Sequence, residues 1–378
     1  MTRDIQPIIA VLQDDKEPLE AVKISEMSNL TRKEEELLRK VWPEISLDKR
    51  RRMITWMSES ADDDVQLDFS AVCILGLSDE DAQVRCHCIQ GLWEHEHFKL
   101  IRPFLTLLRQ DPSVEVRASA ASGLGRFVLQ GEMEYLTQAR LQEIVGTLVK
   151  TVADQSLSLA IRRRAVESLG YSTDPRVSDI ISRAYEDPAE EMRMSAIFAM
   201  GRTADEYWSG TVRTELFNDN PAFRFEAVRA AGELGDPIAV NRIGTLLVDE
   251  DQDQEIREMA AWALGQIGGP IAKKVLMSVI KEDDPSLRRI ARDSLTEMAF
   301  FDDENPNMSF FVPDVVEDES EEHQPWEHGT NGYYQDDDDD EYADDEYTDD
   351  LYDEDQYYDE EYNDEDWNSD KDWLSLPL

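Results

Sequence analysis

An apolar residue followed by arginine recurs along the chain at nearly constant intervals. The pair occurs seven times, at Val84-Arg85, Val116-Arg117, Ile161-Arg162, Met192-Arg193, Phe223-Arg224, Ile256-Arg257 and Leu287-Arg288. Successive arginines are 32, 45, 31, 31, 33 and 31 residues apart. So regular a period indicates an array of repeated structural units rather than one compact core.

Each arginine belongs to an amphipathic helical pattern. Three and six residues after it the side chain is small, and seven after it the side chain is usually large and apolar, as in Ala120, Gly123 and Leu124. Offsets −1, +3, +4 and +7 share one face of a helix, so this face is predicted to be buried, with small residues admitting a neighbouring helix closely. Eight residues after five of the arginines stands a glycine, which predicts a left-handed cap that ends the helix. These glycines are Gly125, Gly170, Gly201, Gly232 and Gly265.

A second apolar helical pattern precedes each arginine helix, for example at 101–109, 177–185, 240–248 and 272–280. A turn with Asp-Pro or Asn-Pro separates the two at four places, and both residue types favour a helix start. These turns are Asp111-Pro112, Asp187-Pro188, Asn220-Pro221 and Asp284-Pro285. Each unit is therefore predicted as helix, turn, helix, with an extended first helix within 130–153 absorbing the longest step.

The motif Asp-Pro-x-x-x-Val-Arg-x-x-Ala-x-x-x-Leu-Gly at 111–125 resembles HEAT repeats of the phycobilisome-lyase-like type. The resemblance covers residues 64–299 and implies an all-α fold, an α-solenoid that forms a superhelix of about seven to eight HEAT-like helix pairs. It also implies a ladder between neighbouring units, formed by the arginines and the aspartates six residues before them. These are Asp79, Asp111, Asp187 and Asp251.

Residues 1–63 fit the repeat poorly, although 31–41 and 47–60 have helical patterns. We interpret this segment as a degenerate helical N-terminal cap that shields the first unit.

The net charge of −46 is concentrated at the end of the chain. Residues 301–378 hold 32 of the 84 acidic residues and one basic residue, Lys371. Residues 300–378 are predicted to be a disordered acidic tail rich in Asp, Glu and Tyr, because they have too little apolar surface to offset the entropy of ordering. At its end, Trp373, Leu374 and Leu376 form a candidate docking motif. The tail contacts basic partners, covers basic residues of the solenoid, or only maintains solubility.

Composition narrows the expected cellular location and the expected kind of partner. Three cysteines are too few for a disulfide framework, and no stretch approaches the 18 apolar residues of a membrane span. We expect a cytoplasmic protein without membrane contact. One basic cluster, residues 162–164, on an acidic body is poor evidence for nucleic acid. Because polyanions attract cationic proteins, the acidic tail leads us to expect a protein partner with a basic surface. A capped solenoid is complete by itself, so we expect a monomer.

Few residues suggest chemistry. Cys86, Cys88, His95 and His97 have zinc-ligand side chains, but their spacing fits no common zinc motif and Cys88 occupies a buried small position of the repeat. His95-Glu96 is a single His-Glu dyad, whereas the HEAT-like deoxyhypusine hydroxylases use several to hold iron. Bilin lyases share the repeat, but no chromophore site stands out. We therefore predict no catalytic residue, no cofactor and no metal.

A binding surface is better supported. Offsets +1, +2 and +5 lie away from the buried face and supply aromatic, methionine and arginine side chains, the composition of a protein interface. The residues are Met194, Phe198, Phe225, Arg229, Met259 and Trp262. The alternative is that they pack against the neighbouring helix.

We expect a non-enzymatic protein-binding scaffold or adaptor that uses the curved solenoid surface, with the acidic tail contacting basic partners. The alternatives are an enzyme or enzyme accessory of the bilin-lyase or metal-hydroxylase (oxidoreductase) type, and a chaperone for basic proteins acting through the polyanionic tail.

Overall fold

The computed structural model describes residues 5–60, 67–93, 95, 97–281 and 284–301. Within these residues every regular element is a helix. All of them belong to one compact unit of the chain. The acidic tail from residue 302 onward, including the candidate motif Trp373, Leu374 and Leu376, lies outside the described residues.

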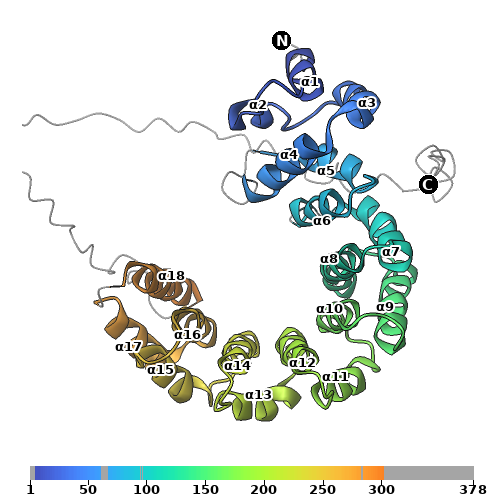
Figure 1. Ribbon diagram of the computed structural model, residues 1–378. Helices are drawn as coiled ribbons and strands as arrows, with labels where there is room; N and C mark the ends of the chain where they lie inside the picture. Colours follow the sequence, from blue (N-terminus) through green and yellow to red (C-terminus); the bar gives the residue numbers. More distant parts are fainter. Residues whose placement is uncertain (1–4, 61–66, 94, 96, 282–283, 302–378) are drawn as a thin grey trace, which may run out of the picture. The chain divides into compact units, whose positions relative to one another are not determined.

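The helices form two layers, as Figure 1 shows. One layer holds the arginine-bearing second helices of each pair, which we term B helices, and consecutive B helices pack against one another. The B helices are α4 (Leu47–Ser60), α6 (Ala82–Gly91), α8 (Val114–Glu132), α10 (Leu159–Leu169), α12 (Glu190–Arg202), α14 (Pro221–Glu233), α16 (Gln254–Ile267) and α18 (Pro285–Phe301). This is the predicted all-α solenoid.

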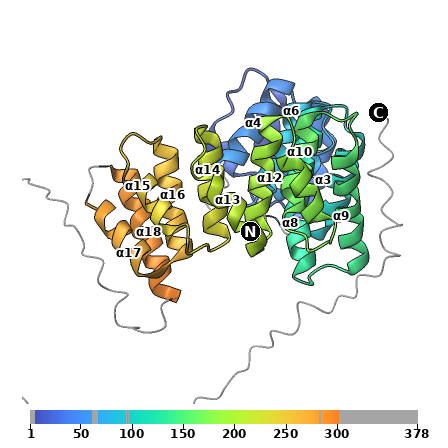
Figure 2. The same cartoon turned by 90° about the horizontal axis from the view of Figure 1, so that it is seen from below.

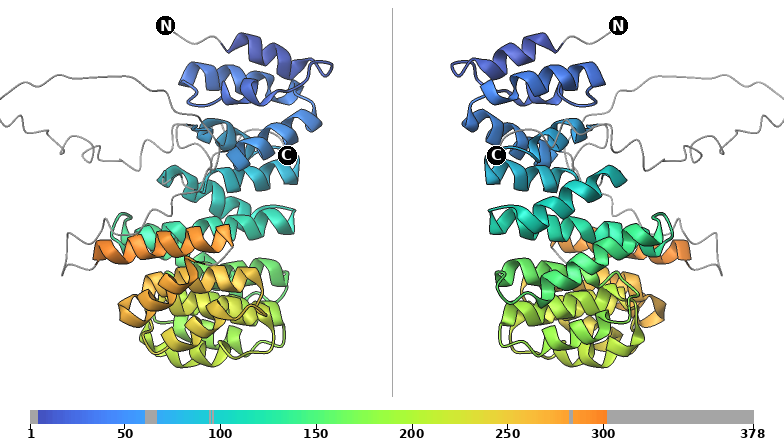
Figure 3. Two further views of the ribbon diagram at one scale, coloured as in Figure 1. Left: turned by 90° about the vertical axis from the view of Figure 1, so that its left-hand side faces the viewer. Right: turned by 90° about the vertical axis from the view of Figure 1, so that its right-hand side faces the viewer.

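The other layer holds the first helices of each pair, the A helices, which pack against the B helices but little against one another. Figure 2 shows the same array from below, and Figure 3 shows the successive pairs from two sides. The A helices are α5 (Ser70–Gly76), α7 (Ile101–Gln110), α9 (Gln138–Ala153), α11 (Val177–Tyr185), α13 (Ser209–Glu215), α15 (Val240–Val248) and α17 (Gly269–Val279). The remaining helices are α1 (Gln6–Gln13), α2 (Ala21–Ser25), α3 (Arg32–Val41) and the short 3-10 helices Trp42–Glu44, Phe98–Leu100 and Glu206–Trp208.

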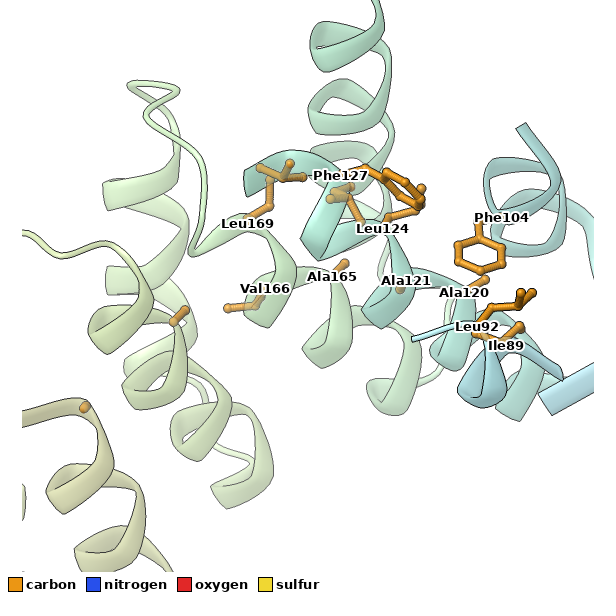
Figure 4. Close-up of a cluster of buried hydrophobic side chains, with 14 of the residues drawn as sticks. Ile89, Leu92, Phe104, Ala120, Ala121, Leu124, Phe127, Ala165, Val166 and Leu169 are labelled. Atoms are coloured by element: carbon orange, nitrogen blue, oxygen red, sulfur yellow. The ribbon is translucent and has the colours of Figure 1, made fainter. Parts of the chain in front are cut away.

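The predicted buried face is confirmed. The small residue three positions after each arginine is fully buried in all seven units, and the apolar residue before each arginine is buried as well. Figure 4 shows how Ala120 and Ala165 on adjacent B helices lie among larger side chains such as Phe104 and Leu124. The long step between Arg117 and Arg162 is absorbed by two long helices, because α8 and α9 have 19 and 16 residues.

The prediction that the glycines at offset +8 form left-handed caps is wrong. Gly125, Gly201, Gly232 and Gly265 lie inside their helices, and Gly170 caps α10 with φ −56°. A Cβ at Gly170 would lie 2.8 Å from the Ala199 carbonyl oxygen of the next B helix. These glycines therefore permit close packing of consecutive B helices.

In two of the units, a glycine that ends the helix lies three residues after the close-packing glycine. Gly235, after α14, has φ +61°, and Gly268, after α16, has φ +73°. Both backbones are in the region that favours glycine, and neither position would bring a Cβ within 4 Å of another group. The stop and the close approach are thus separate functions of different glycines.

The arginine ladder is present at one end of the array. Arg85 donates two hydrogen bonds of 2.8 Å to Asp111 of the next unit, and both side chains are more than nine-tenths buried. The same arginine, and also Arg117, Arg193, Arg224 and Arg257, donates to carbonyls that end its own A helix or form the following turn, as Arg117 does to Leu108 and Arg257 does to Leu247. Because those carbonyls have no partner within their helix, the arginine joins the two helices of a pair.

The N-terminal segment takes part in the same ladder. Arg50 on α4 lies 2.8 Å from Asp79, and Arg51 pairs with Asp81. Trp42 Nε1 also donates to Asp79, at 2.7 Å. The helix α4 packs on α6 as one B helix packs on the next. The predicted cap therefore presents a B-like helix to the first regular unit.

Replacing Asp111 by alanine is expected to lower the free energy of unfolding by about 3 kcal/mol, because Arg85 would remain buried without its carboxylate. The matched control is Asp293→Ala, which removes the same charge from the exposed pair Arg289–Asp293 and is expected to cost about 0.5 kcal/mol or less. Urea unfolding followed by circular dichroism measures both. Equal losses would contradict the ladder as a stabilising contact.

Replacing Gly170 by alanine is expected to destabilise the protein by about 1–3 kcal/mol, because the new methyl group would collide with the backbone of Ala199. A Cβ at Gly146 on α9 would have no atom within 4 Å, so Gly146→Ala is expected to stabilise by about 0.5–1 kcal/mol. Thermal unfolding of both variants measures the opposite signs. A stabilising Gly170→Ala would show that this glycine is not needed for helix packing.

Candidate functional site

The six residues predicted as a binding surface lie on three consecutive B helices, α12, α14 and α16. All six are partly or largely buried rather than fully exposed. Met194, Phe225, Met259 and Trp262 pack against the core, and Arg229 is buried. Packing against the neighbouring helix, the alternative given by the sequence, thus explains the buried part of these side chains. The binding role of the six residues stays a prediction.

Arg229 is the centre of the group. Its guanidinium lies over the Phe198 ring, 3.7 Å from the ring centroid. Its Nη1 donates to Glu233 at 2.6 Å and its Nε donates to Glu226 at 3.0 Å. Stacking and two carboxylates therefore hold the side chain in one orientation.

Arg202 on α12 extends this arrangement to the preceding units. Its guanidinium lies 5.2 Å from the Phe198 ring centroid and 5.3 Å from that of Tyr171, which follows α10. Its Nε lies 3.4 Å from Glu233 Oε1. Glu233 thus lies between two arginines, and aromatic rings support both guanidinium groups.

A shallow hollow of about 680 Å³, wide open to solvent, lies beside this group, and we term it the Arg229 hollow. It lies at the C-terminal ends of consecutive B helices. The side chains that line it include Tyr171, Arg202, Arg229, Glu233, Met259, Trp262 and Gln266. Of the predicted residues, Arg229, Met259 and Trp262 line the hollow, whereas Met194, Phe198 and Phe225 do not.

The sequence analysis missed Tyr171, Arg202, Glu233 and Gln266. All four lie nine residues after a repeat arginine, one helical turn beyond offset +5 and directly after the close-packing glycine position. The signal was therefore present in the repeat. It was overlooked because the glycine was interpreted as the end of the helix.

Burial changes the acid–base behaviour of the hollow. Loss of solvent raises the pKa of Glu233 and of Glu226 above the usual range, although Arg229 opposes the shift. Burial likewise raises the pKa of the Tyr171 hydroxyl. The ionised glutamates are thus less favourable here than in water.

The candidate zinc residues do not converge. Cys88 is buried beside Cys73, whereas the thiol of Cys86 faces Ser119 on the next B helix. Burial raises the pKa of both thiols. Nε2 of His95 lies 3.6 Å from Asp68. Among the described residues no three His, Cys, Asp or Glu side chains are grouped as metal ligands, and Glu96 of the His-Glu dyad lies outside them.

Two models of HEAT repeats match the sequence. One matches residues 100–130 and the other residues 211–296. The chain is a HEAT-repeat protein. The phycobilisome-lyase-like subtype stays a prediction, because both models describe HEAT repeats in general. No curated protein matches the chain.

Several solved structures are similar to this HEAT-repeat protein. Human deoxyhypusine hydroxylase, in complex with glycerol, is 18 % identical with a TM-score of 0.32, over 78 % of this chain and 96 % of that one. The Escherichia coli protein YibA is 17 % identical with a TM-score of 0.40, over 75 % and 98 % of the two chains. Yeast importin-beta is 10 % identical with a TM-score of 0.42, over 81 % and 47 %. Likenesses of this size carry no argument about function.

Helices of these repeats are short or polar, and within the described residues none has the length and apolar character needed to cross a membrane.

The raised pKa values of Glu226 and Glu233 predict how the stability of these HEAT repeats depends on pH. Because the folded state takes up protons at these groups more readily than the unfolded chain, their contribution is fully present below about pH 4.5 and is lost as the pH rises through the raised pKa. The double variant Glu226→Gln/Glu233→Gln should therefore lose less stability than the natural protein between about pH 4.5 and pH 7.

Urea unfolding across that pH range measures this slope. Glu250→Gln removes an exposed carboxylate and is the control, expected to leave the slope nearly unchanged. A slope that is steeper in the double variant than in the natural protein would contradict the assignment.

Proposed function

We propose that the protein is a non-enzymatic scaffold that binds a protein partner on the exposed face of its B-helix layer. The observation that carries the proposal is the Arg229 hollow, in which Tyr171, Trp262 and Met259 surround an open volume beside arginines that are held in place. Aromatic side chains, methionine and arginine are the groups that dominate protein interfaces.

The charges of the hollow support binding rather than bond chemistry. Glu233 and Glu226 contact Arg229, and Glu233 also lies near Arg202. Both carboxylates are thus engaged in positioning the arginines, which favours a binding role for this group of side chains. The same pairs keep the side chains ordered, so a partner that docks here loses little entropy in ordering the site.

The acidic tail adds a second element to the proposal. Its 32 acidic residues attract cationic protein surfaces, and interspersed tyrosines supply rings for arginine and lysine. We propose that the tail contacts basic regions of the same partner. Because exposed charges are screened over about 8 Å at physiological ionic strength, this contact weakens as salt is added.

Blocking the hollow tests the scaffold proposal. Gln266 is exposed at the hollow, so Gln266→Arg places a long side chain there without disturbing the core, and captured partners are expected to be lost by about tenfold or more. Gln138→Arg on the A helix α9 is the matched control and should retain them. Quantitative capture from source-cell lysate at low and high salt measures both variants. Equal capture by Gln266→Arg and the natural protein would refute the role of the hollow.

Removing residues 302–378 tests the contribution of the tail. The truncated chain is expected to keep the salt-resistant partners and to lose those that bind only at low salt. Circular dichroism controls for folding. Capture that is unchanged at low salt would show that the tail makes no contact with the partner.

A further inference from the structure

The exposed face of the B-helix layer changes the sign of its charge at the Arg229 hollow. We term this surface, formed by offsets +1, +2, +5 and +9 of the helices α8 to α18, the B face. On the N-terminal side of the hollow, formed by α8, α10 and α12, the charged residues of the B face are Arg126, Arg163, Arg164, Arg202 and Glu167. On the C-terminal side, formed by α14, α16 and α18, the charged residues are Glu226, Glu233, Glu258, Asp293, Glu297, Arg229 and Arg289.

Contacts between consecutive helices show that these residues share one surface. Arg163 on α10 donates to Ser195 on α12 at 3.1 Å. Arg202 on α12 lies 3.4 Å from Glu233 on α14. Gln266 on α16 donates to Glu297 on α18 at 2.9 Å. The B face is therefore continuous across the change of sign.

The two central minority charges are turned inward. Side chains of Glu167 and Arg229 are only 9 % and 10 % exposed, and each is paired with neighbours on its own helix. By contrast, 46 % of Arg164 and 34 % of Arg202 are exposed on the basic side. On the acidic side, Glu233 and Glu226 are also largely buried, at 11 % and 24 % exposed. The carboxylates that reach solvent there are the half-buried Glu258, the exposed Glu297 and Asp293, which pairs with the exposed Arg289. An approaching ligand thus meets mainly arginines on one side of the hollow and mainly carboxylates on the other.

The change of sign is unexpected for a chain with a net charge of −46. A uniformly acidic face would favour any basic ligand, and a uniformly basic face any acidic ligand. A face with both signs favours a ligand that carries them in the matching order and disfavours one that presents like charges on either side.

We propose that the B face binds an extended protein segment with acidic residues on one side of a central aromatic anchor and basic residues on the other. The anchor occupies the Arg229 hollow against Trp262 and Tyr171. The acidic residues lie over α8 to α12 and the basic residues over α14 to α18. This rests on the proposed function, because the anchor uses the same hollow.

The repeat sets the spacing within that segment. Packed helices are about 8–10 Å apart, and an extended chain rises about 3.3 Å per residue. One HEAT unit therefore corresponds to about three residues of the segment. The flanking charges are expected about three and six residues from the anchor, in line with the first two helices on each side.

Synthetic peptides of 13 residues test the charge order on the full-length protein. One has a central Trp with Glu at positions three and six before it and Lys at positions three and six after it; the others have Glu on both sides, Lys on both sides, or Ala in place of Trp. Fluorescence anisotropy at low salt is expected to show the mixed peptide binding about tenfold more tightly than each of the others. The advantage should shrink in high salt because the charges are screened.

A charge reversal gives a test that impaired folding cannot imitate, because it predicts a gain of binding. Glu258→Lys/Glu297→Lys makes the acidic side basic, so the peptide with Glu on both sides should then bind more tightly than the mixed peptide. Glu186→Lys/Glu250→Lys changes the net charge equally at exposed sites in turns and is expected to leave the order of affinities unchanged.

Three results would overturn the inference. Tightest binding of the all-Lys peptide to the natural protein would assign capture to the acidic tail rather than to the B face. If both double variants changed the peptide affinities equally, net charge alone would explain the effect. Failure of every peptide to bind, while Gln266→Arg still loses the captured partner, would leave the scaffold proposal standing and show that the segment described here is wrong.

Discussion

Consecutive B helices stack because small residues on each of them let the two backbones approach closely. At offset +3 every unit has a fully buried small residue, and at offset +8 five units have glycine against the neighbouring helix. Dispersion and burial of apolar surface both require this contact, because a HEAT unit has no core of its own. A single added methyl group at Gly170 would separate two helices, and in a stacked array such a displacement affects every following unit.

The same close packing builds the candidate site. Glycine at offset +8 brings the backbones together, so the side chains at offset +9 of neighbouring helices come within reach of one another. Arg202 and Glu233 meet for this reason, and the ring of Tyr171 lies against Arg202. The Arg229 hollow opens where the side chains of the following helix, Met259 and Trp262, reach toward this group. Packing and binding surface are therefore two consequences of one repeat motif.

The sequence was sufficient for the repeat and for the helix pairs because both depend on local periodicity. Val177–Tyr185 and Val240–Val248 were predicted to the residue, since apolar spacing and turn signals agree there. The glycine caps were wrong because a glycine that ends a helix and one that admits a neighbouring helix look the same in a single sequence. The distinction depends on a contact with residues about 30 positions away, such as Gly170 with Ala199.

The candidate site was predictable in composition but not in geometry. Offsets identified Arg229, Met259 and Trp262, but helix rotation decides which of the six residues line the hollow. The charge pattern of the B face was harder to predict. Net charge is a sum over the whole chain, whereas recognition depends on how the charges are arranged on one surface. In a protein with 46 more negative than positive charges, the arginines at offsets +1, +2 and +9 of α8 to α12 are diluted in the total. Only when the helices are aligned do Arg164 and Arg202 lie on one side of the hollow and Glu258 and Glu297 on the other. For solenoids, charge is therefore informative when it is summed by repeat position rather than along the chain.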